Sequence, residues 1–147
     1  MQVNVDTIEY VSNLREMIRD SHQVVITVAG WSMEPFLRNQ RDRVLLQKPS
    51  RPPKVGDIVF YQRKTGQYVL HRIYKSKPEG YYMQGDHLTD EEGPIEADAI
   101  FAMVTEVERN GRWFSVDALG WRFTSSLWRL LSPARKLYSL ARKAMRP

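Results

Sequence analysis

Ser32 and His71 are the residues of this sequence whose surroundings best suit nucleophilic chemistry. Ser32 lies in the segment Gly30-Trp31-Ser32-Met33-Glu34-Pro35, just after the β-rich run 24–28, and His71 lies in a second β-rich run, 68–73. A serine hydroxyl attacks a carbonyl effectively when a neighbouring base takes its proton, and histidine can be that base near neutral pH. Alone, each residue is more often structural, as a turn serine or a packed sheet histidine. Together they predict an activated serine nucleophile.

The composition indicates one globular domain with an ordinary core. The chain has 147 residues, of which 42% are hydrophobic, and it contains no cysteine. Without cysteine there is no disulfide and no thiolate metal site, which agrees with a reducing compartment. The three histidines, His22, His71 and His87, are scattered and lack the paired spacing of a zinc site. We therefore expect neither a metal nor a cofactor.

Two observations bear on localisation. No segment approaches the ~20 consecutive apolar residues that a transmembrane helix needs. The first residues also lack the basic and apolar regions of a signal peptide. From the sequence we therefore expect a cytoplasmic protein.

The positive charge is concentrated at the C-terminal end of the chain. The formal net charge is +5, yet residues 118–147 contain seven Lys and Arg side chains and no acidic one. Residues 1–117 therefore have a net charge of −2. The basic character belongs to the tail and not to the region of Ser32 and His71.

Three zones follow one another along the chain. Apolar positions at helical spacing over 6–21 predict an N-terminal helix within residues 1–22. Residues 23–117 alternate short β-rich runs with turn signals, of which Asn110-Gly111 is a strong hairpin turn. The predicted strands are Val24–Val28, Arg43–Gln47, Asp57–Gln62, Tyr68–Tyr74, Gly80–Gln84, Ala99–Glu108 and Trp113–Ser115. We expect a mainly β fold, a coiled sheet or partial barrel with flanking helices.

The tail, residues 118–147, is predicted to be helical over 121–146 with one break at Ser132-Pro133. After the break, Leu137 and Leu140 share one helical face, while basic side chains occupy the other. Such a basic amphipathic helix packs on its own domain, binds a partner or nucleic acid, or lies on an anionic membrane surface. We regard nucleic acid as the least expected of these partners.

Several segments resemble, in order, those of the serine peptidase superfamily that includes signal peptidase I and the LexA-type self-cleaving repressors. Gly30–Pro35 is similar to the nucleophile box, and Asp42–Leu46 resembles the strand that follows that box. Lys54-Val55-Gly56-Asp57-Ile58-Val59-Phe60 closely resembles the Gly-Asp-Ile-Val strand of the superfamily. His71-Arg72 falls where bacterial signal peptidases carry a lysine–arginine pair, and Gln84-Gly85-Asp86 resembles the later Gly-Asp box. Ala102–Val104 falls where the terminal strand of the superfamily begins.

The resemblance implies a coiled-sheet catalytic domain and a peptidase mechanism. Ser32 would be the nucleophile and His71 the general base, as in the archaeal and endoplasmic-reticulum branch of the superfamily. A carboxylate would orient the histidine. Asp86 is our first choice for that role, and Asp90, Glu91 or Glu92 are the alternatives in the same acidic loop.

The sequence also departs from the resembled proteins. Gly30 stands where signal peptidases commonly carry a serine, so backbone N–H groups, including that of Ser32, would bind the oxyanion. A transmembrane anchor and a DNA-binding domain are not evident before the β region. Two hypotheses result. The chain is a serine endopeptidase that trims a precursor or leader peptide in the cytoplasm or at the inner membrane surface, or it is a catalytically silent binding module of the same fold.

Overall fold

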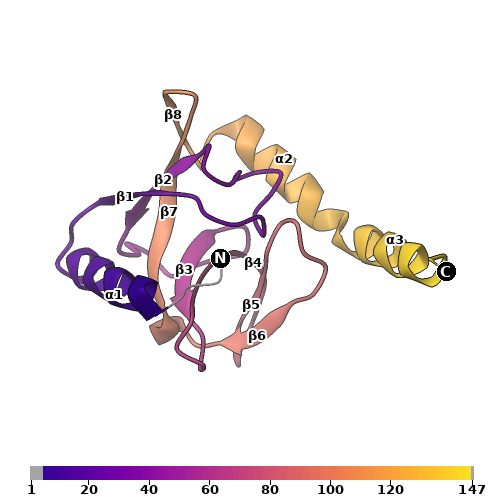
Figure 1. Cartoon of the computed structure of the whole chain (residues 1–147), viewed down its shortest axis with the longest axis horizontal. Helices are drawn as coiled ribbons and strands as arrows, with labels where there is room; N and C mark the ends of the chain where they lie inside the picture. Colours follow the sequence, from indigo (N-terminus) through magenta and orange to yellow (C-terminus); the bar gives the residue numbers. More distant parts are fainter. Residues whose placement is uncertain (1–4, 147) are drawn as a thin grey trace.

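An antiparallel sheet of eight strands organises the part of the chain, residues 5–146, that a computed structural model describes. The strands lie in the order β1-β2-β7-β3-β4-β5-β6, and β8 pairs with β7 (Figure 1). One helix precedes the sheet and two follow it. The elements are α1 (Val5–Arg19), β1 (Val24–Thr27), β2 (Arg43–Gln47), β3 (Ile58–Gln62), β4 (Tyr68–Lys77), β5 (Gly80–Gln84), β6 (Glu92–Ile95), the short 3₁₀ helix η1 (Ala97–Ala99), β7 (Ile100–Arg109), β8 (Arg112–Ser115), α2 (Leu119–Leu130) and α3 (Ser132–Ala144).

Side-chain alternation along β3 and β4 divides the core into two clusters. Phe60 and Leu70 are paired across the two strands and belong to the main cluster, which α1 covers. Their neighbours Tyr61 and Val69 are also paired and lie in a second, smaller cluster. Successive side chains of a strand point to opposite faces of the sheet, so the sequence alternation decides which cluster each residue joins.

The predicted mainly β fold with an N-terminal helix and C-terminal helices is confirmed. The hairpin turn at Asn110-Gly111 joins β7 to β8, and both residues have positive φ, 52° and 79°, as a tight hairpin turn requires. Two elements were not predicted: β6 and η1. The segment Glu92–Ile95 contains Gly93 and Pro94, which disfavour a strand interior, and it is tolerated because β6 lies at the sheet edge.

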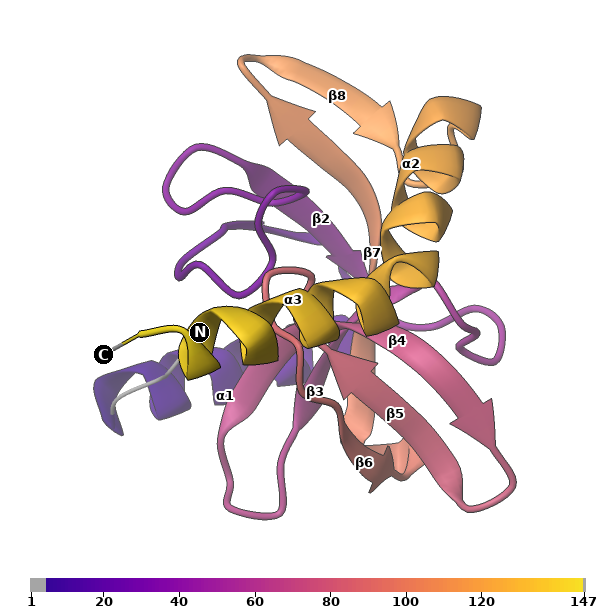
Figure 2. The same cartoon turned by 90° about the vertical axis from the view of Figure 1, so that its right-hand side faces the viewer.

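The two tail helices differ in how they meet the sheet. Helix α2 packs on the β domain through Trp121, which meets Phe36 and the β8 residue Phe114, and through Trp128, which binds the Asp86 backbone; Ser125 is buried. Helix α3 has no buried residue and extends away from the sheet with the C-terminus at its far end (Figures 1 and 2). The chain bends at Leu131, one residue before the predicted break. Over residues 5–146, no helix has both the length and the apolar character needed to cross a membrane.

Candidate active site

Ser32 lies in the tight turn that follows β1. Gly30 has a φ of 92°, a value that favours glycine, and its N–H donates to Asn39 Oδ1 at 2.9 Å. Just beyond Ser32, Met33 and Leu37 are buried in the main cluster and hold the turn against the core. Ser32 itself is half-buried, at the boundary between the core and solvent.

A small cavity lies beside Ser32, next to an unpaired stretch of backbone. The cavity has a volume of about 10 Å³, and Ser32 and Leu70 both line it. Leu70 belongs to β4, which pairs with β3 from Tyr68 to Arg72 but with β5 only from Arg72 onward. Within the described residues, the 68–71 stretch of β4 therefore has one edge with no strand partner. The turn that carries Ser32 lies beside this stretch.

The loop after β5 holds the backbone of Ser32 in place. The His87 N–H donates to the Ser32 carbonyl oxygen at 2.9 Å. A Cβ atom at Gly85 would lie only 2.5 Å from the same oxygen, closer than real Cβ contacts. Glycine is therefore required at position 85 for the loop to approach the Ser32 turn this closely.

His71 is buried beside a carboxylate from the sheet edge. Its Nδ1 atom lies 3.4 Å from the Tyr61 hydroxyl and 3.6 Å from Glu92 Oε1. The Tyr61 O–H donates to that same Glu92 oxygen, and the Arg63 guanidinium donates to both Glu92 oxygens, with its shortest bond at 2.9 Å. The Nδ1 side of the ring is therefore the side with the carboxylate, and the Nε2 side is turned away from Glu92.

The charges of this cluster follow from burial and from its hydrogen bonds. Burial lowers the pKa of His71 below its ordinary 6.5, although Glu92 acts in the opposite direction. Burial alone would raise the pKa of Glu92, but its contacts with His71, Arg63 and Tyr61 together lower it to about 2. Burial and the bond to Glu92 raise the pKa of Tyr61 above its usual range. Near neutral pH, His71 is thus a neutral base beside an ionised carboxylate.

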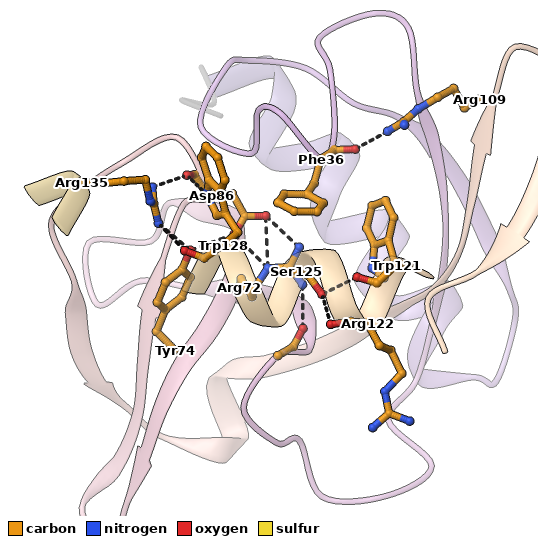
Figure 3. Close-up of polar contacts among 11 residues, drawn as sticks. Phe36, Arg72, Tyr74, Asp86, Arg109, Trp121, Arg122, Ser125, Trp128 and Arg135 are labelled. Carbon is orange, nitrogen blue, oxygen red and sulfur yellow. Dashed lines mark hydrogen bonds and ion pairs between the residues drawn. The ribbon is translucent and has the colours of Figure 1, made fainter. Parts of the chain in front are cut away.

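Asp86, our first choice from the sequence, is bound elsewhere. It is fully buried with Arg72, and the Arg72 Nε and Nη2 atoms each donate to it at 2.8 Å. The Tyr74 O–H donates to Asp86 Oδ1 at 3.1 Å. Figure 3 shows that Trp128 and Arg135 of the tail helices also converge on Asp86, donating to its backbone carbonyl. These contacts make Asp86 the partner of a buried arginine rather than of His71.

The other acidic residues of the segment point to different basic partners. Asp90 is exposed, 3.9 Å from the Lys136 ammonium of α3. Glu91 pairs with Lys75 of β4 at 3.0 Å. Of the four carboxylates considered from the sequence, Glu92 is the one that the structure places beside His71.

The structure shows no hydrogen bond between Ser32 and His71 among the described residues. The polar contacts of the His71 ring are to Tyr61 and Glu92 instead. Leu70, which lines the Ser32 cavity, and His71 point to opposite faces of β4 by strand alternation. In the part of the chain that the structure describes, no group of three or more potential ligands could hold a metal ion.

Tyr61 and Arg63 are the site residues that the sequence argument missed. Both lie at or just after the end of β3, within the segment that follows the Gly-Asp-Ile-Val motif. Their spacing of two places them on one face of the sheet, the same face as His71. Alternation alone indicates that Tyr61 and Arg63 share a face. The pairing of β3 with β4 is needed to show that His71 lies on the same face.

Comparison with known proteins gives one match. A family model described as Peptidase S24-like matches residues 2–104. This range includes Ser32, His71, Asp86 and Glu92. Searches among curated proteins and among solved structures found no match.

Proposed function

The chain belongs to the Peptidase S24-like family, and we propose that it is a serine endopeptidase with Ser32 as nucleophile, His71 as general base and Glu92 as the carboxylate that orients His71. The observation that carries this proposal is the Tyr61–His71–Glu92 cluster. A buried histidine beside an ionised carboxylate has the tautomer and charge that a general base needs.

The proposed reaction uses the two ring nitrogens of His71 for different tasks. Nδ1 carries its proton toward Tyr61 and Glu92, which leaves the lone pair of Nε2 for the Ser32 hydroxyl. As Ser32 Oγ bonds to the peptide carbonyl carbon, its proton passes to Nε2. The same proton then goes to the leaving amine when the C–N bond breaks. Water, deprotonated by Nε2, hydrolyses the resulting acyl-enzyme and regenerates both residues.

The oxyanion formed in this reaction needs hydrogen-bond donors. The Ser32 N–H makes no hydrogen bond to any residue within 5–146, so it is available as one donor. The contacts from Gly85 and His87 fix the Ser32 backbone, which pre-organises that N–H.

The substrate that suits this site is an extended peptide. It would add as a strand along the unpaired edge of β4 at residues 68–71, where backbone hydrogen bonds supply affinity. The cavity of about 10 Å³ beside Ser32 has room for a group about the size of one water molecule or methyl. A small side chain such as alanine just before the cleaved bond fits this volume. A precursor or leader peptide is the substrate class that we propose.

One observation favours the second candidate, a catalytically silent module of the same fold. Ser32 and His71 are not hydrogen-bonded to each other among the described residues, and the cavity beside Ser32 lies on the Leu70 face of β4, opposite to His71. The peptidase mechanism therefore requires the Ser32 turn and the His71 ring to approach each other when substrate binds, whereas the silent module requires no such movement. The two candidates differ in the reactivity of Ser32.

Labelling with a serine-reactive fluorophosphonate probe decides between them. We expect wild-type protein to be labelled on Ser32 and the His71→Ala protein to be labelled far more slowly, by several orders of magnitude. His87→Ala is the matched control, because His87 contacts the Ser32 turn through its backbone and not through its ring. Equal, negligible labelling of wild type and Ser32→Ala would favour the silent module. Circular dichroism of each variant separates loss of reactivity from loss of fold.

A further inference from the structure

The tail helices present an apolar face that nothing in the described chain covers. On α2, Phe123 is 72% exposed and Leu130 is 77% exposed. On α3, Leu137 is 70% exposed and Leu140 is 55% exposed. Isolated exposed apolar residues are ordinary, but a row of them along two successive helices marks an interaction surface. The remaining members of this row are Leu119, Leu127, Tyr138 and Met145.

The side of each helix that meets the sheet is the opposite one. On α2, Trp121 and Trp128 pack edge-on against Phe36, and Trp128 Nε1 donates to Asp86. Phe123 is two residues from Trp121, about 200° around the helix, so it points away from the sheet. On α3, Arg135 stacks on Trp128 while Leu137, again two residues on, points away. The sheet therefore does not use the apolar face of either helix.

The charge of the tail indicates what binds to the apolar face of α2 and α3. Residues 118–147 contain seven basic side chains and no acidic one. Arg129 and Arg135 are engaged by the sheet side, where Arg129 lies against Gly56 and Arg135 binds Asp86. The exposed ones include Arg142 and Lys143 in the last turn of α3, and Arg146 just after it. A helix with one apolar face and only positive charges elsewhere is complementary to an anionic bilayer, where the leucines enter the headgroup boundary and the cations bind lipid phosphates.

We infer that the apolar face of α2 and α3 docks the protein on an anionic lipid bilayer, parallel to its surface, with the sheet held on the water side. This inference does not depend on the catalytic proposal. It predicts peripheral, salt-sensitive binding, because the interaction between exposed charges and the surface is screened by ions.

Co-sedimentation of the full-length protein with vesicles tests the inference. We expect binding to vesicles of phosphatidylcholine and phosphatidylglycerol in equal parts, weaker binding at high salt, and little binding to phosphatidylcholine alone. The Ser32→Ala protein should bind as wild type does. Its binding would separate this inference from the catalytic proposal.

Two pairs of variants probe the two faces. Leu137→Gln with Leu140→Gln should reduce partitioning by about tenfold or more, because both side chains leave the apolar face. Arg142→Gln with Lys143→Gln should reduce partitioning to anionic vesicles by about fivefold per charge. Met17→Gln on the exposed side of α1 and Lys64→Gln in the β3–β4 turn are the matched controls, which should bind normally.

The same proteins examined by light scattering identify the competing occupant. The inference is overturned if the wild-type protein does not co-sediment with anionic vesicles. It is also overturned if the Leu137→Gln, Leu140→Gln protein binds them as well as the wild type does. Suppose instead that the wild-type protein does not co-sediment with vesicles but forms a dimer, and that the Leu137→Gln, Leu140→Gln substitutions dissociate it. The apolar face would then bind a second copy of the chain. Circular dichroism of each variant checks that both helices are retained.

Discussion

His71 Nδ1 lies 3.6 Å from Glu92 Oε1, across a sequence separation that no local pattern connects. The contact depends on β5 and β6, because the pairing of Met83 with Glu92 brings the edge strand toward β4. Tyr61 and Arg63 then hold the carboxylate from the side of β3. Residues from the end of β3 and from β6 thus meet at the imidazole of β4, and this distinguishes Glu92 from the nearby acidic residues.

Replacing Glu92 with glutamine should lower kcat by about 10²–10⁴ while the protein stays folded. The amide cannot stabilise the imidazolium that forms in the reaction, and it no longer fixes the tautomer of His71. Cleavage of a soluble peptide under single-turnover conditions measures the effect. Glu91→Gln is the matched control, because it makes the same change one residue away at a surface pair with Lys75. Similar kcat values for the two variants would remove Glu92 from the mechanism.

Replacing Asp86 with asparagine should instead reduce stability, by about 3–5 kcal/mol in the free energy of unfolding. The change leaves the Arg72 guanidinium, 1% exposed, without its counter-charge in the core. Chemical denaturation measures the loss, and adding Arg72→Met to Asp86→Asn should restore part of it because the uncompensated charge is then gone. An Asp86→Asn protein of unchanged stability but abolished activity would return Asp86 to the catalytic role.

The pH dependence of cleavage should report the burial of His71. Catalysis requires the neutral ring, and burial lowers the pKa of His71 below 6.5, so the rising limb of kcat/KM should be centred on the acid side of that value. The same shift makes the folded protein bind protons less readily than the unfolded chain, so this contribution to stability falls as the pH drops below 6.5. A limb centred above about pH 8 would indicate a lysine base instead.

Gly85→Ala should displace the Ser32 turn. The new Cβ would lie 2.5 Å from the Ser32 carbonyl oxygen, and that oxygen is backbone, so relief requires the loop or the turn to move. We expect the activation free energy derived from kcat/KM to change more than the free energy of unfolding. An ångström-scale misplacement of the reacting atoms has a large effect on the rate. Gly120→Ala is the control, because Gly120 likewise has no positive φ and a Cβ atom there would meet nothing within 4 Å. Parallel losses in both variants would show that the close approach of Gly85 to the Ser32 carbonyl is not responsible.

Local pattern was enough to predict most strands, the hairpin turn and the Ser32 segment, because each depends on neighbouring residues. The choice among Asp86, Asp90, Glu91 and Glu92 was not local. It depends on the pairing of the edge strand β6. Gly93 and Pro94 have low strand propensity, so the sequence does not predict this strand. The buried Arg72–Asp86 pair has the same cause. Asp86 lies two residues beyond the end of β5, and it meets Arg72 only because the register of β4 with β5 pairs Arg72 with Gln84.

The tail shows a second limit of the same kind. Periodicity identified the apolar and basic faces of residues 121–146, but an amphipathic face is equally suited to a core or to an external surface. Trp121 and Trp128 pack against Phe36, whereas Leu137 and Leu140 stay exposed. The difference depends on which residues of the β domain lie opposite each helix, and the sequence of the tail does not determine that.

Two truncations should therefore differ greatly in their effect on stability. Removing residues 137–147 takes away no buried residue of α3 and keeps Arg135 on Asp86, so the melting temperature should change little. Removing residues 119–147 also takes away Trp121 and Trp128 from Phe36 and uncovers the Arg72–Asp86 pair. Loss of a packed tryptophan typically costs about 3–5 kcal/mol, a large part of the stability of a domain this size. Differential scanning calorimetry of both truncated proteins makes the comparison. Equal melting temperatures would mean that α2 is an appendage, and unfolding of both would mean that α3 belongs to the core.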